Sequence, residues 1–340
     1  MRKKILIIRF SSFGDIFHGL CVVPSLRKLG YEIHWLVRSD FKDLLTIAPI
    51  DKVHSFDRKD GLLGLFRLGQ RLKRLRFNAV YDAHNNLRSN ILKWYAFAPW
   101  SRIFRGTKFI QRSKFRFKRF LLFKLRINKF PSPYKAMSSF LSPLKSLGVD
   151  QEYKGSEIFS VSDEVIKSTK LKLASEDKLN RIILAPSAAW EMKTWPIDNW
   201  NKLIELMPDH KFYIIGGPSD KFCQEFEKNF SDRVVNLAGK LSLLESVALI
   251  NISPLLICAD TGVLHVADLF SKSTIALMGP TAFGFTSTNA IETLSVDLKC
   301  RPCTKDGRGK CTQDIYQKCM VQIDPELVAK KANELFPASI

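Results

Sequence analysis

Short apolar runs alternate with helix-length segments along most of this 340-residue chain, and this alternation restricts its fold more than any other feature. Short strands separated by helical segments form βαβ units, whose strands build a parallel sheet with helices on its faces. The alternation occurs in two series, and 340 residues exceed the usual size of one hydrophobic core. We therefore predict an α/β fold with two Rossmann-like domains, whose parallel sheets face a central cleft.

Residues 150–162 separate the two series of elements. In the first series we expect strands at 5–9, 33–37, 53–56, 79–82 and 102–104, and helices at about 16–29, 62–75, 87–97 and 132–148. In the second we expect strands at 181–185, 212–215, 234–237, 255–259 and 274–278, and helices at 197–206, 220–230, 243–250, 263–270 and 325–335. The predicted domains cover 1–155 and 156–325, and the C-terminal helix, in 326–340, is expected to pack back towards the N-terminal domain.

A strip of basic residues and phenylalanines interrupts the first series, as an insertion near residues 102–130. The chain has a net charge of +20, and no acidic residue lies between Asp82 and Asp150. A helix in this strip would carry one basic and one aromatic face, a pattern typical of surface-seeking helices. The strip is suited to a polyanion, namely nucleic acid, an anionic membrane face or a phosphorylated glycolipid, and a solvated helix face is the plainer interpretation.

The sequence contains no apolar run that approaches the roughly 18–20 residues of a membrane span. Its N-terminus resembles a signal peptide only superficially, because the apolar run after Lys4 is four residues long and is ended by Arg9. We therefore expect a cytoplasmic protein.

The seven cysteines fall into two sets. Cys21, Cys223 and Cys258 stand singly in apolar surroundings and are predicted to be core thiols. The other four lie close together in a polar, basic tail: Cys300, Cys303, Cys311 and Cys319. Four clustered thiols are compatible with a structural zinc site, with disulfides or with free thiols, and we expect no catalytic role for them.

The turn after the first strand contains a single glycine, Gly14, so the dinucleotide fingerprint is absent and bound NAD or FAD is not expected. The same turn carries Asp15, which is either a carboxylate at the mouth of the cleft or a helix cap. In the second series, Lys193 follows a strand and is either a phosphate-binding cation or a surface lysine. Asp220 follows another strand and suits either ribose hydroxyls or a helix cap.

The strongest local signal is an apolar strand that runs directly into Asp260, Thr261 and Gly262, followed by His265 one helical turn later. A second strand runs into Gly279, Pro280 and Thr281 in the same way. In parallel sheets, ligands bind outside the carboxyl ends of the strands, where helix N-termini present unpaired N–H groups to anions. The pattern therefore indicates a nucleotide-sugar enzyme.

Six segments together resemble the inverting glycosyltransferases of the lipopolysaccharide heptosyltransferase type, family 9, which have the GT-B fold. They are Ser11-Ser12-Phe13-Gly14-Asp15, Lys193-x-Trp195-Pro196, Gly216-Gly217-Pro218, Leu237-Ala238-Gly239, Asp260-Thr261-Gly262-x-x-His265 and Gly279-Pro280-Thr281. The order and spacing of these segments are more specific than any one of them. The resemblance implies transfer of a heptose, from ADP-heptose, onto the inner core of a lipopolysaccharide precursor.

Residue roles follow from the same resemblance. Asp15 matches the catalytic base and Lys193 the lysine that neutralises the departing diphosphate. The implied donor-binding residues are Ser187, Ala188, Lys193, Asp220, Asp260, Thr261, Gly262, His265, Gly279, Pro280 and Thr281. The expected acceptor-binding residues are Ser11, Ser12, Gly14, His18, Arg112, Lys114, Arg116, Lys118 and Arg119. Many relatives carry hydroxyl residues or a glycine where this chain has Ala188 and Ala189, which bears on the identity of the donor sugar.

The chain contains no D-x-D pattern of the kind that holds a divalent metal in other glycosyltransferases. A diphosphate leaving group needs charge neutralisation, and cationic side chains and helix dipoles can supply it, so we expect catalysis without a cofactor. The expected partners are a nucleotide-sugar donor and an anionic glycolipid acceptor, met at the inner face of the cytoplasmic membrane. Two alternatives stay open: a nucleotide-sugar epimerase of the same architecture, and a basic nucleic-acid-binding protein, although no nucleic-acid motif is recognisable.

Overall fold

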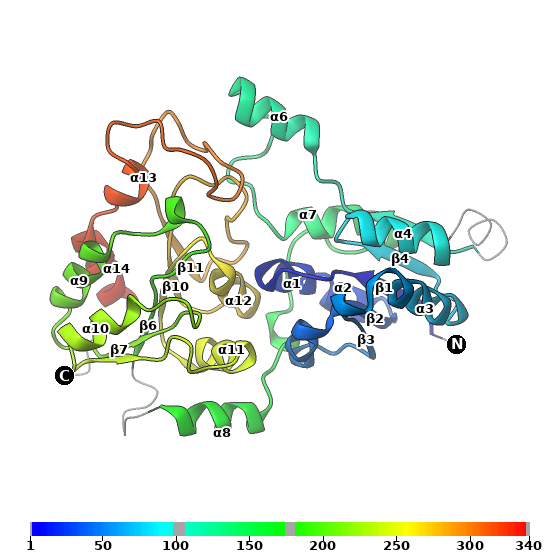
Figure 1. Cartoon of the computed structure of the whole chain (residues 1–340), viewed down its shortest axis with the longest axis horizontal. Coiled ribbons are helices and arrows are strands. Elements are labelled where there is room, and N and C mark those ends of the chain that lie inside the picture. Colours follow the sequence, from blue (N-terminus) through cyan, green and yellow to red (C-terminus); the bar gives the residue numbers. More distant parts are fainter. Residues whose placement is uncertain (1, 98–105, 174–180, 338–340) are drawn as a thin grey trace. The chain divides into compact units, whose positions relative to one another are not determined.

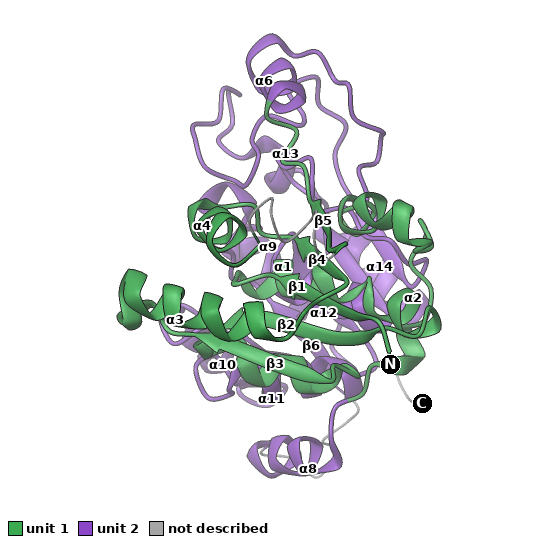
Figure 2. Ribbon diagram, turned by 90° about the vertical axis from the view of Figure 1, so that its right-hand side faces the viewer, with its two compact units in different colours: residues 1–116, 136–160 green, residues 117–135, 161–340 purple. Residues whose placement is uncertain are grey.

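The computed structural model describes residues 2–97, 106–173 and 181–337. The chain divides into two compact units, coloured separately in Figure 2. Unit 1 comprises Met1–Arg116 and Ala136–Ser160, and unit 2 comprises Phe117–Lys135 and Val161–Ile340. Each unit contains one parallel sheet and helices, which confirms the predicted α/β class. The insertion was expected in the N-terminal domain, but residues 117–135 belong to unit 2, because their aromatic side chains pack around Phe283.

The sheet of unit 1 has the strand order β3-β2-β1-β4-β5, and all neighbouring strands are parallel. Its strands are β1 (Lys4–Ile8), β2 (Glu32–Arg38), β3 (Lys52–Phe56), β4 (Ala79–Asp82) and β5 (Lys108–Gln111). The first four lie at or within one residue of their predicted positions. The strand expected at 102–104 lies outside the described residues. The edge strand β5 was not predicted, because its half-exposed residues form no apolar run.

Unit 1 places helices on both faces of this sheet. They are α1 (Phe13–Leu20), α2 (Val23–Lys28), α3 (Gly61–Arg74), α4 (Leu87–Ala96) and α7 (Ser138–Leu141), with 3₁₀ helices η1 (Ser39–Ile47), η2 (Arg58–Asp60), η3 (Ser142–Leu147) and η4 (Ser156–Ile158). The single helix expected at 16–29 is divided into α1 and α2, and Pro24 lies in the first turn of α2, where its missing N–H costs nothing. The helix expected at 132–148 begins only at Ser138, as α7, and continues as η3 to its C-cap Gly148, which adopts φ 85°.

The sheet of unit 2 has the order β11-β10-β9-β6-β7-β8 and is also parallel throughout. Its strands are β6 (Ile182–Ala185), β7 (Phe212–Ile214), β8 (Val234–Asn236), β9 (Leu256–Ala259), β10 (Thr274–Leu277) and β11 (Ile291–Leu294). Five of the six were predicted. The missed strand, β11, alternates buried Ile291 with exposed Glu292 at the edge of the sheet.

The helices of unit 2 are α6 (Arg116–Leu125), α8 (Asp163–Lys172), α9 (Ile197–Glu205), α10 (Cys223–Asn229), α11 (Leu243–Ile252), α12 (Gly262–Phe270), α13 (Lys318–Val321) and α14 (Pro325–Leu335), with the 3₁₀ turn η5 (Glu191–Lys193). Figure 1 shows α9, α10 and α14 on one face of the sheet, and α11 and α12 on the other. Val328, Ala329 and Ala332 of α14 are buried in the core of unit 2, and packing of this helix towards the N-terminal domain stays a prediction.

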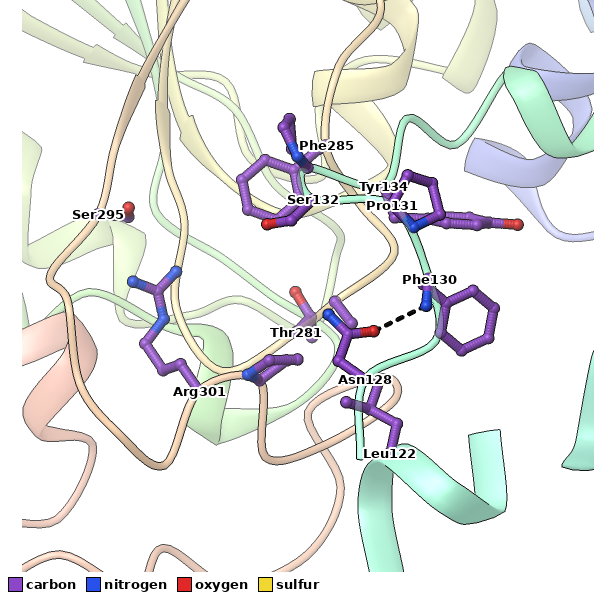
Figure 3. Close-up of a pocket in the computed structure, with 13 residues that line it drawn as sticks. Leu122, Asn128, Phe130, Pro131, Ser132, Tyr134, Thr281, Phe285, Ser295 and Arg301 are labelled. Atoms are coloured by element: carbon purple, nitrogen blue, oxygen red, sulfur yellow. Dashed lines mark hydrogen bonds between the residues drawn. The ribbon is translucent and has the colours of Figure 1, made fainter. Parts of the chain in front are cut away.

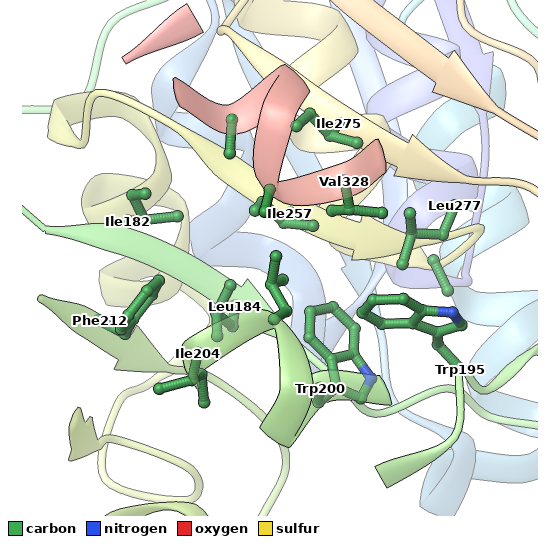
Figure 4. Close-up of a cluster of buried hydrophobic side chains, with 14 of the residues drawn as sticks. Ile182, Leu184, Trp195, Trp200, Ile204, Phe212, Ile257, Ile275, Leu277 and Val328 are labelled. Atoms are coloured by element: carbon green, nitrogen blue, oxygen red, sulfur yellow. The ribbon is translucent and has the colours of Figure 1, made fainter. Parts of the chain in front are cut away.

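That core lies between the sheet and the α9, α10 and α14 face (Figure 4). Alternate strand residues, such as Ile182 and Leu184, point into it, as the period of two requires. Trp195 and Trp200 meet edge to face, with ring centroids 4.9 Å apart. The Trp195 indole N–H donates to the carbonyl of Ile323 at 3.1 Å. Since Trp195 follows Lys193 by two residues, this buried ring fixes the end of the Lys193 loop.

We predict that Glu245→Gln destabilises unit 2 in a pH-dependent way. Glu245 belongs to the capping box of α11 and accepts from Lys172 of α8 at 2.8 Å. Desolvation alone would raise the pKa of Glu245, but Lys172, Ser242 and Ser168 outweigh it and lower that pKa to about 2. The carboxylate therefore stabilises the fold above its unfolded pKa of roughly 4.3, and this contribution is lost as pH falls towards 2.

Urea unfolding measures this effect. At pH 7 the variant should lose on the order of 1–3 kcal/mol of unfolding free energy, as for a hydrogen bond to a charged group. The difference from wild type should persist to about pH 4 and shrink as pH falls from there towards 2. Glu152→Gln is the control, because the Glu152 side chain is 83% exposed and its pair with Lys154 should contribute almost nothing. A difference that stays constant from pH 7 down to about pH 2.5 would contradict the assignment.

Candidate active site

The predicted donor residues lie at one edge of the unit 2 sheet. They follow β6, β7, β9 and β10, which are consecutive neighbours in the order β10-β9-β6-β7. Because these strands are parallel, their carboxyl ends meet at the same edge, where α/β proteins bind their ligands. Residues from four separate loops therefore lie at this edge.

Asp260 is the centre of this edge. It is buried, and its Oδ2 lies 3.0 Å from Lys193 Nζ. The same oxygen accepts a hydrogen bond from Thr281 Oγ1 at 2.5 Å. The other oxygen, Oδ1, lies 3.7 Å from His265 Nε2. The loops after β6, β9 and β10 and the first turn of α12 are thus joined through one carboxylate.

The charge state of Asp260 follows from these contacts. Desolvation by burial alone would raise the pKa of the Asp260 carboxyl, but Lys193, His265 and the Thr281 hydroxyl outweigh it and lower that pKa. An ionised carboxylate beside a lysine is the arrangement that a buried charge requires. Lys193 is consequently held at a fixed position, with its side chain only 15% exposed.

Two glycines leave the room that this arrangement needs. A Cβ at Gly284 would lie 2.1 Å from Asp260 Oδ1. A Cβ at Gly307, whose φ is +93°, would lie 2.7 Å from Lys193 Cγ. The backbone of the cysteine tail therefore runs directly against the Lys193 side chain, and the loop after β10 runs directly against Asp260.

Thr261 occupies the N-cap position of α12, yet its side chain makes no capping hydrogen bond. Its Oγ1 is buried and finds no hydrogen-bond partner among the residues that the structure describes. Buried hydroxyls normally have a partner. An N-terminal helix turn with free N–H groups and an unsatisfied hydroxyl, next to Lys193, is chemically suited to a phosphate group.

A second group of predicted donor residues lies over β6 and β7. Asp220 Oδ2 accepts a hydrogen bond from the Gly217 N–H at 2.6 Å, so this carboxylate closes the turn before α10. A Cβ at Gly216 would lie 2.9 Å from Asp220 Oδ2 and 3.0 Å from Ser187 Oγ. Ser187, Gly216 and Asp220 are therefore close neighbours, while the adjacent Ala188 contributes no polar side-chain atom.

Gly279 and Pro280 are buried, and their carbonyls are already occupied. Arg301 Nε donates to the Gly279 carbonyl at 2.8 Å, and the Cys303 N–H donates to the Pro280 carbonyl at 3.0 Å. Gly279 and Pro280 can therefore affect donor binding only by setting the shape of the loop after β10. Arg301, which sequence reasoning missed, joins the tail to this loop by donating also to the carbonyls of Met278 and Val296.

All seven cysteines are free thiols. Among residues 2–97, 106–173 and 181–337, no three His, Cys, Asp or Glu side chains converge to hold a metal ion. Zinc binding by Cys300, Cys303, Cys311 and Cys319 therefore stays a prediction. What the tail does in this structure is cover the Lys193 loop: Gln317 donates to the Glu191 carbonyl, and Arg308 stacks over Trp190 at 5.1 Å.

In unit 1, Asp15 lies in the first turn of α1, directly after β1. It pairs with the Arg9 guanidinium and accepts a hydrogen bond from Ser12 Oγ at 3.0 Å. Arg9 is buried and also donates from Nη1 to the Ala83 carbonyl at 2.9 Å. Sequence reasoning missed Arg9. The signal was present, because a charged residue at the end of a buried strand needs a partner.

Several cations act on Asp15. Desolvation alone would raise the pKa of the Asp15 carboxyl, but Arg9, Arg112, His18 and the Ser12 hydroxyl hold it well below its usual range. The lowered pKa means that the Asp15 carboxyl is ionised at neutral pH. Its side chain is 38% exposed, so the carboxylate is also accessible within unit 1. Arg112 is positioned by stacking over Phe140 at 3.9 Å and by donating to Ser139 Oγ. Ser12, His18 and Arg112 were all predicted acceptor residues, and they meet at Asp15.

The remaining predicted acceptor residues are dispersed. Ser11 bonds through its backbone to His84, whose pKa falls to about 4 through burial and the charges of Arg9 and Lys114. Gly14 is buried within α1. Arg116 and Lys118 are exposed, whereas Arg119 stacks over Phe283 of unit 2 at 4.7 Å. The basic strip is therefore divided between the units: Arg112 lies beside Asp15 in unit 1, and Arg119 belongs to unit 2.

A cavity of about 200 Å³ lies within unit 2, between the 117–135 segment and the loop after β10 (Figure 3). Its lining residues are Leu122, Asn128, Phe130, Pro131, Ser132, Pro133, Tyr134, Thr281, Ala282, Phe285, Ser295, Arg301 and Pro302. Figure 3 shows Phe130 and Tyr134 on one side and Arg301 and Ser295 on the other. Aromatic rings with amide and hydroxyl groups can hold a sugar ring, and Thr281 connects this cavity to Asp260.

In the described part of the chain, every helix is too short or too polar to cross a lipid bilayer.

Comparison with known proteins gives consistent results. The family model described as "Glycosyltransferase family 9 (heptosyltransferase)" matches residues 65–313. A curated relative, the lipopolysaccharide core heptosyltransferase OpsX of Haemophilus influenzae, is 25% identical over 284 residues, which cover 81% of this chain and 78% of the relative.

Solved structures share the fold over almost the whole chain. A glycosyl transferase family 9 protein from Veillonella parvula superposes with a TM-score of 0.76 at 21% identity, covering 99% of this chain and 98% of the other. The E. coli ADP-heptose lipopolysaccharide heptosyltransferase II gives a TM-score of 0.73 at 18% identity, covering 98% of each chain. The predicted GT-B fold is confirmed.

We predict that Arg112→Met raises the pKa of Asp15 towards the ordinary value for aspartate, because one of the cations that favours the carboxylate is removed. Methionine keeps most of the packing over Phe140. A pH titration of the aspartate carboxyl carbons by NMR measures the shift, and the spectrum of Asp15→Asn identifies the resonance. Lys42→Met, at an exposed lysine of unit 1, is the control and should leave the Asp15 titration unchanged. An unshifted Asp15 in Arg112→Met would contradict the electrostatic assignment.

Proposed function

The chain belongs to glycosyltransferase family 9 and is a glycosyltransferase, and from this premise we propose that it transfers a heptose from ADP-heptose onto the inner core of a lipopolysaccharide precursor. Family membership removes the epimerase and nucleic-acid-binding alternatives. The observation that carries the proposal is the anion-binding edge of unit 2, where Lys193 is held by Asp260 beside the unsatisfied Thr261 hydroxyl. The printed names of the relatives support the sugar and the acceptor.

The donor is assigned to unit 2. Its diphosphate would receive hydrogen bonds from the N–H groups at the start of α12 and from Thr261 Oγ1, and the positive charge of Lys193 would neutralise it. His265 lies one turn into the same helix, against Asp260. Asp220 and Ser187, next to the glycine turn after β7, are assigned to the nucleoside. The cavity beside Thr281 is suited to a sugar of the donor or acceptor.

The proposed reaction is an inverting displacement that uses one residue from each unit. The acceptor hydroxyl attacks the anomeric carbon and gives its proton to the Asp15 carboxylate, while the bond from the anomeric carbon to the diphosphate breaks and the diphosphate leaves with the electron pair. Because its pKa is lowered, Asp15 is ionised throughout the neutral range. Lys193 and the α12 dipole stabilise the charge that develops on the leaving group, without a cofactor.

The acceptor is assigned to the cationic surroundings of Asp15, namely Arg112, Lys114 and His18, with Ser11 and Ser12. A phosphorylated, acidic glycolipid is complementary to this charge. Such an acceptor is anchored in a bilayer, so we further propose that the enzyme works as a peripheral protein at the inner face of the cytoplasmic membrane.

The donor assignment predicts the behaviour of Thr261→Val. Since the hydroxyl has no partner within the described residues, removing it should leave the melting temperature of the nucleotide-free protein nearly unchanged. It should weaken ADP binding by about tenfold or more, because a hydrogen bond to a charged group contributes roughly 1.5–3 kcal/mol. Calorimetry measures both quantities. The control, Thr169→Val, removes a hydroxyl that donates to the Val165 carbonyl, and it should lower stability while sparing ADP affinity. Unchanged ADP affinity in Thr261→Val would reject the phosphate site.

The catalytic assignment predicts that Asp15→Asn lowers kcat by roughly 10²–10⁴-fold, the usual contribution of a general base. ADP affinity should not change, because the donor residues belong to unit 2. Single-turnover transfer from ADP-heptose to a lipopolysaccharide precursor is the measurement. Asp40→Asn, at an exposed aspartate of unit 1, is the matched control and should keep wild-type kcat. A normal kcat in Asp15→Asn would remove Asp15 from the mechanism.

A further inference from the structure

The helix α6 exposes large apolar side chains at an unusual density. Phe117 is 72% exposed, Phe120 53%, Leu125 54% and Ile127 45%. Exposed single apolar residues are common, but four within eleven residues, three on α6 and one just after it, are a dense group. Figures 1 and 2 show α6 projecting from unit 2, away from the six-stranded sheet.

The opposite face of α6 is firmly attached to unit 2. Phe283, from the loop after β10, is surrounded by Phe123, Phe130 and Tyr134, with ring centroids 5.9, 5.1 and 5.2 Å away. Arg119 stacks over the same ring at 4.7 Å, and Leu122 is buried. After α6, Arg126 Nη1 approaches the carbonyls of Cys300 and Pro302, each at 3.4 Å. The orientation of the helix is therefore set by contacts within unit 2.

Helical spacing separates the two faces. Arg119, Leu122 and Phe123, at i, i+3 and i+4, face the body of unit 2. Phe117, Phe120 and Lys124, at i, i+3 and i+7, lie on the opposite side and are all exposed. The outward surface thus carries two exposed phenylalanines with Lys124 between them.

Basic residues lie on and beside this surface. Arg116, Lys118, Lys124, Arg126 and Lys129 are exposed, and no acidic residue lies anywhere between Asp82 and Asp150. Two copies of this surface would repel one another, so self-association does not cover it. Exposed phenylalanines and aliphatic side chains next to lysine and arginine are the composition of helices that lie in the interface of an anionic bilayer.

We propose that α6 is the membrane-docking element of this protein: Phe117, Phe120, Leu125 and Ile127 enter the headgroup region of an anionic bilayer, and the bordering basic residues bind lipid phosphates. This deepens the proposed function, since it names the element that brings unit 2 to the surface where a lipid-anchored acceptor lies. The binding itself requires neither donor nor acceptor, so it can be tested apart from transfer.

The test is co-sedimentation of the full chain with vesicles of phosphatidylcholine and phosphatidylglycerol at 3:1, compared with phosphatidylcholine alone. Wild type should bind the anionic vesicles, and less well at higher salt. Phe117→Ser with Phe120→Ser should raise the lipid concentration for half-binding by about tenfold or more. Lys124→Glu with Lys129→Glu should raise it by about 20-fold on anionic vesicles, since each basic residue contributes several-fold.

The matched control is Leu62→Ser with Leu63→Ser on α3, because these leucines are 59% and 72% exposed. The control should bind vesicles as wild type does. An equal loss in the control, or unchanged binding in the phenylalanine variant, overturns the proposal, as does a preference for a single-stranded oligonucleotide over the anionic vesicles.

Transfer to a deacylated, soluble acceptor separates this inference from the proposed function. The phenylalanine variant should keep the wild-type rate with that acceptor and lose rate only with a vesicle-embedded one. If the wild-type protein binds vesicles but transfers no heptose, the proposed function is rejected and the membrane-docking proposal stands. If it transfers heptose but binds no vesicles, the membrane-docking proposal is rejected and the proposed function stands.

Discussion

The carboxylate of Asp260 is the contact on which the organisation of unit 2 depends. It is a buried charge, and a buried charge persists only where cations and hydrogen-bond donors surround it. Lys193, Thr281 and His265 satisfy that requirement from three separate segments of the chain. The buried charge of Asp260 therefore holds the Lys193 loop, the loop after β10 and the first turn of α12 together. The adjacent Thr261 hydroxyl is among the buried polar groups that find no partner within the described residues.

Unit 1 also contains a carboxylate that is stabilised by neighbouring cations, but this one is not fully buried. Asp15 is also surrounded by cations, Arg9 and Arg112, but its side chain stays partly exposed. A paired carboxylate with a lowered pKa is a weak base at rest. It becomes effective only when the hydroxyl that attacks grows more acidic, as happens while a bond to the anomeric carbon forms. The two aspartates thus differ in accessibility: Asp260 holds other side chains in place, whereas Asp15 can reach a substrate.

Most of the fold could be predicted from the sequence, because buried central strands such as β1 and β9 are continuous apolar runs. The missed strands, β5 and β11, lie at sheet edges, where partly exposed polar residues interrupt the apolar run. Of the site, Asp15, Lys193, Asp260 and Thr281 were named correctly as neighbours of strand ends, but their pairing was not, since it depends on contacts between distant loops. Arg9 and Arg301 were missed because they lie outside the six segments that carry the family resemblance.

The chain passes from unit 1 to unit 2 and back before unit 2 is complete, and this order affects folding during synthesis. Residues 117–135 supply the rings around Phe283 and part of the cavity wall of unit 2, yet the chain then returns to unit 1 for 136–160. A fragment beginning at Val161 would keep the six-stranded sheet and lose those rings. During synthesis on the ribosome, α6 must wait for Phe283, more than 150 residues later in the chain, so its apolar side chains stay unprotected until nearly the whole protein has emerged.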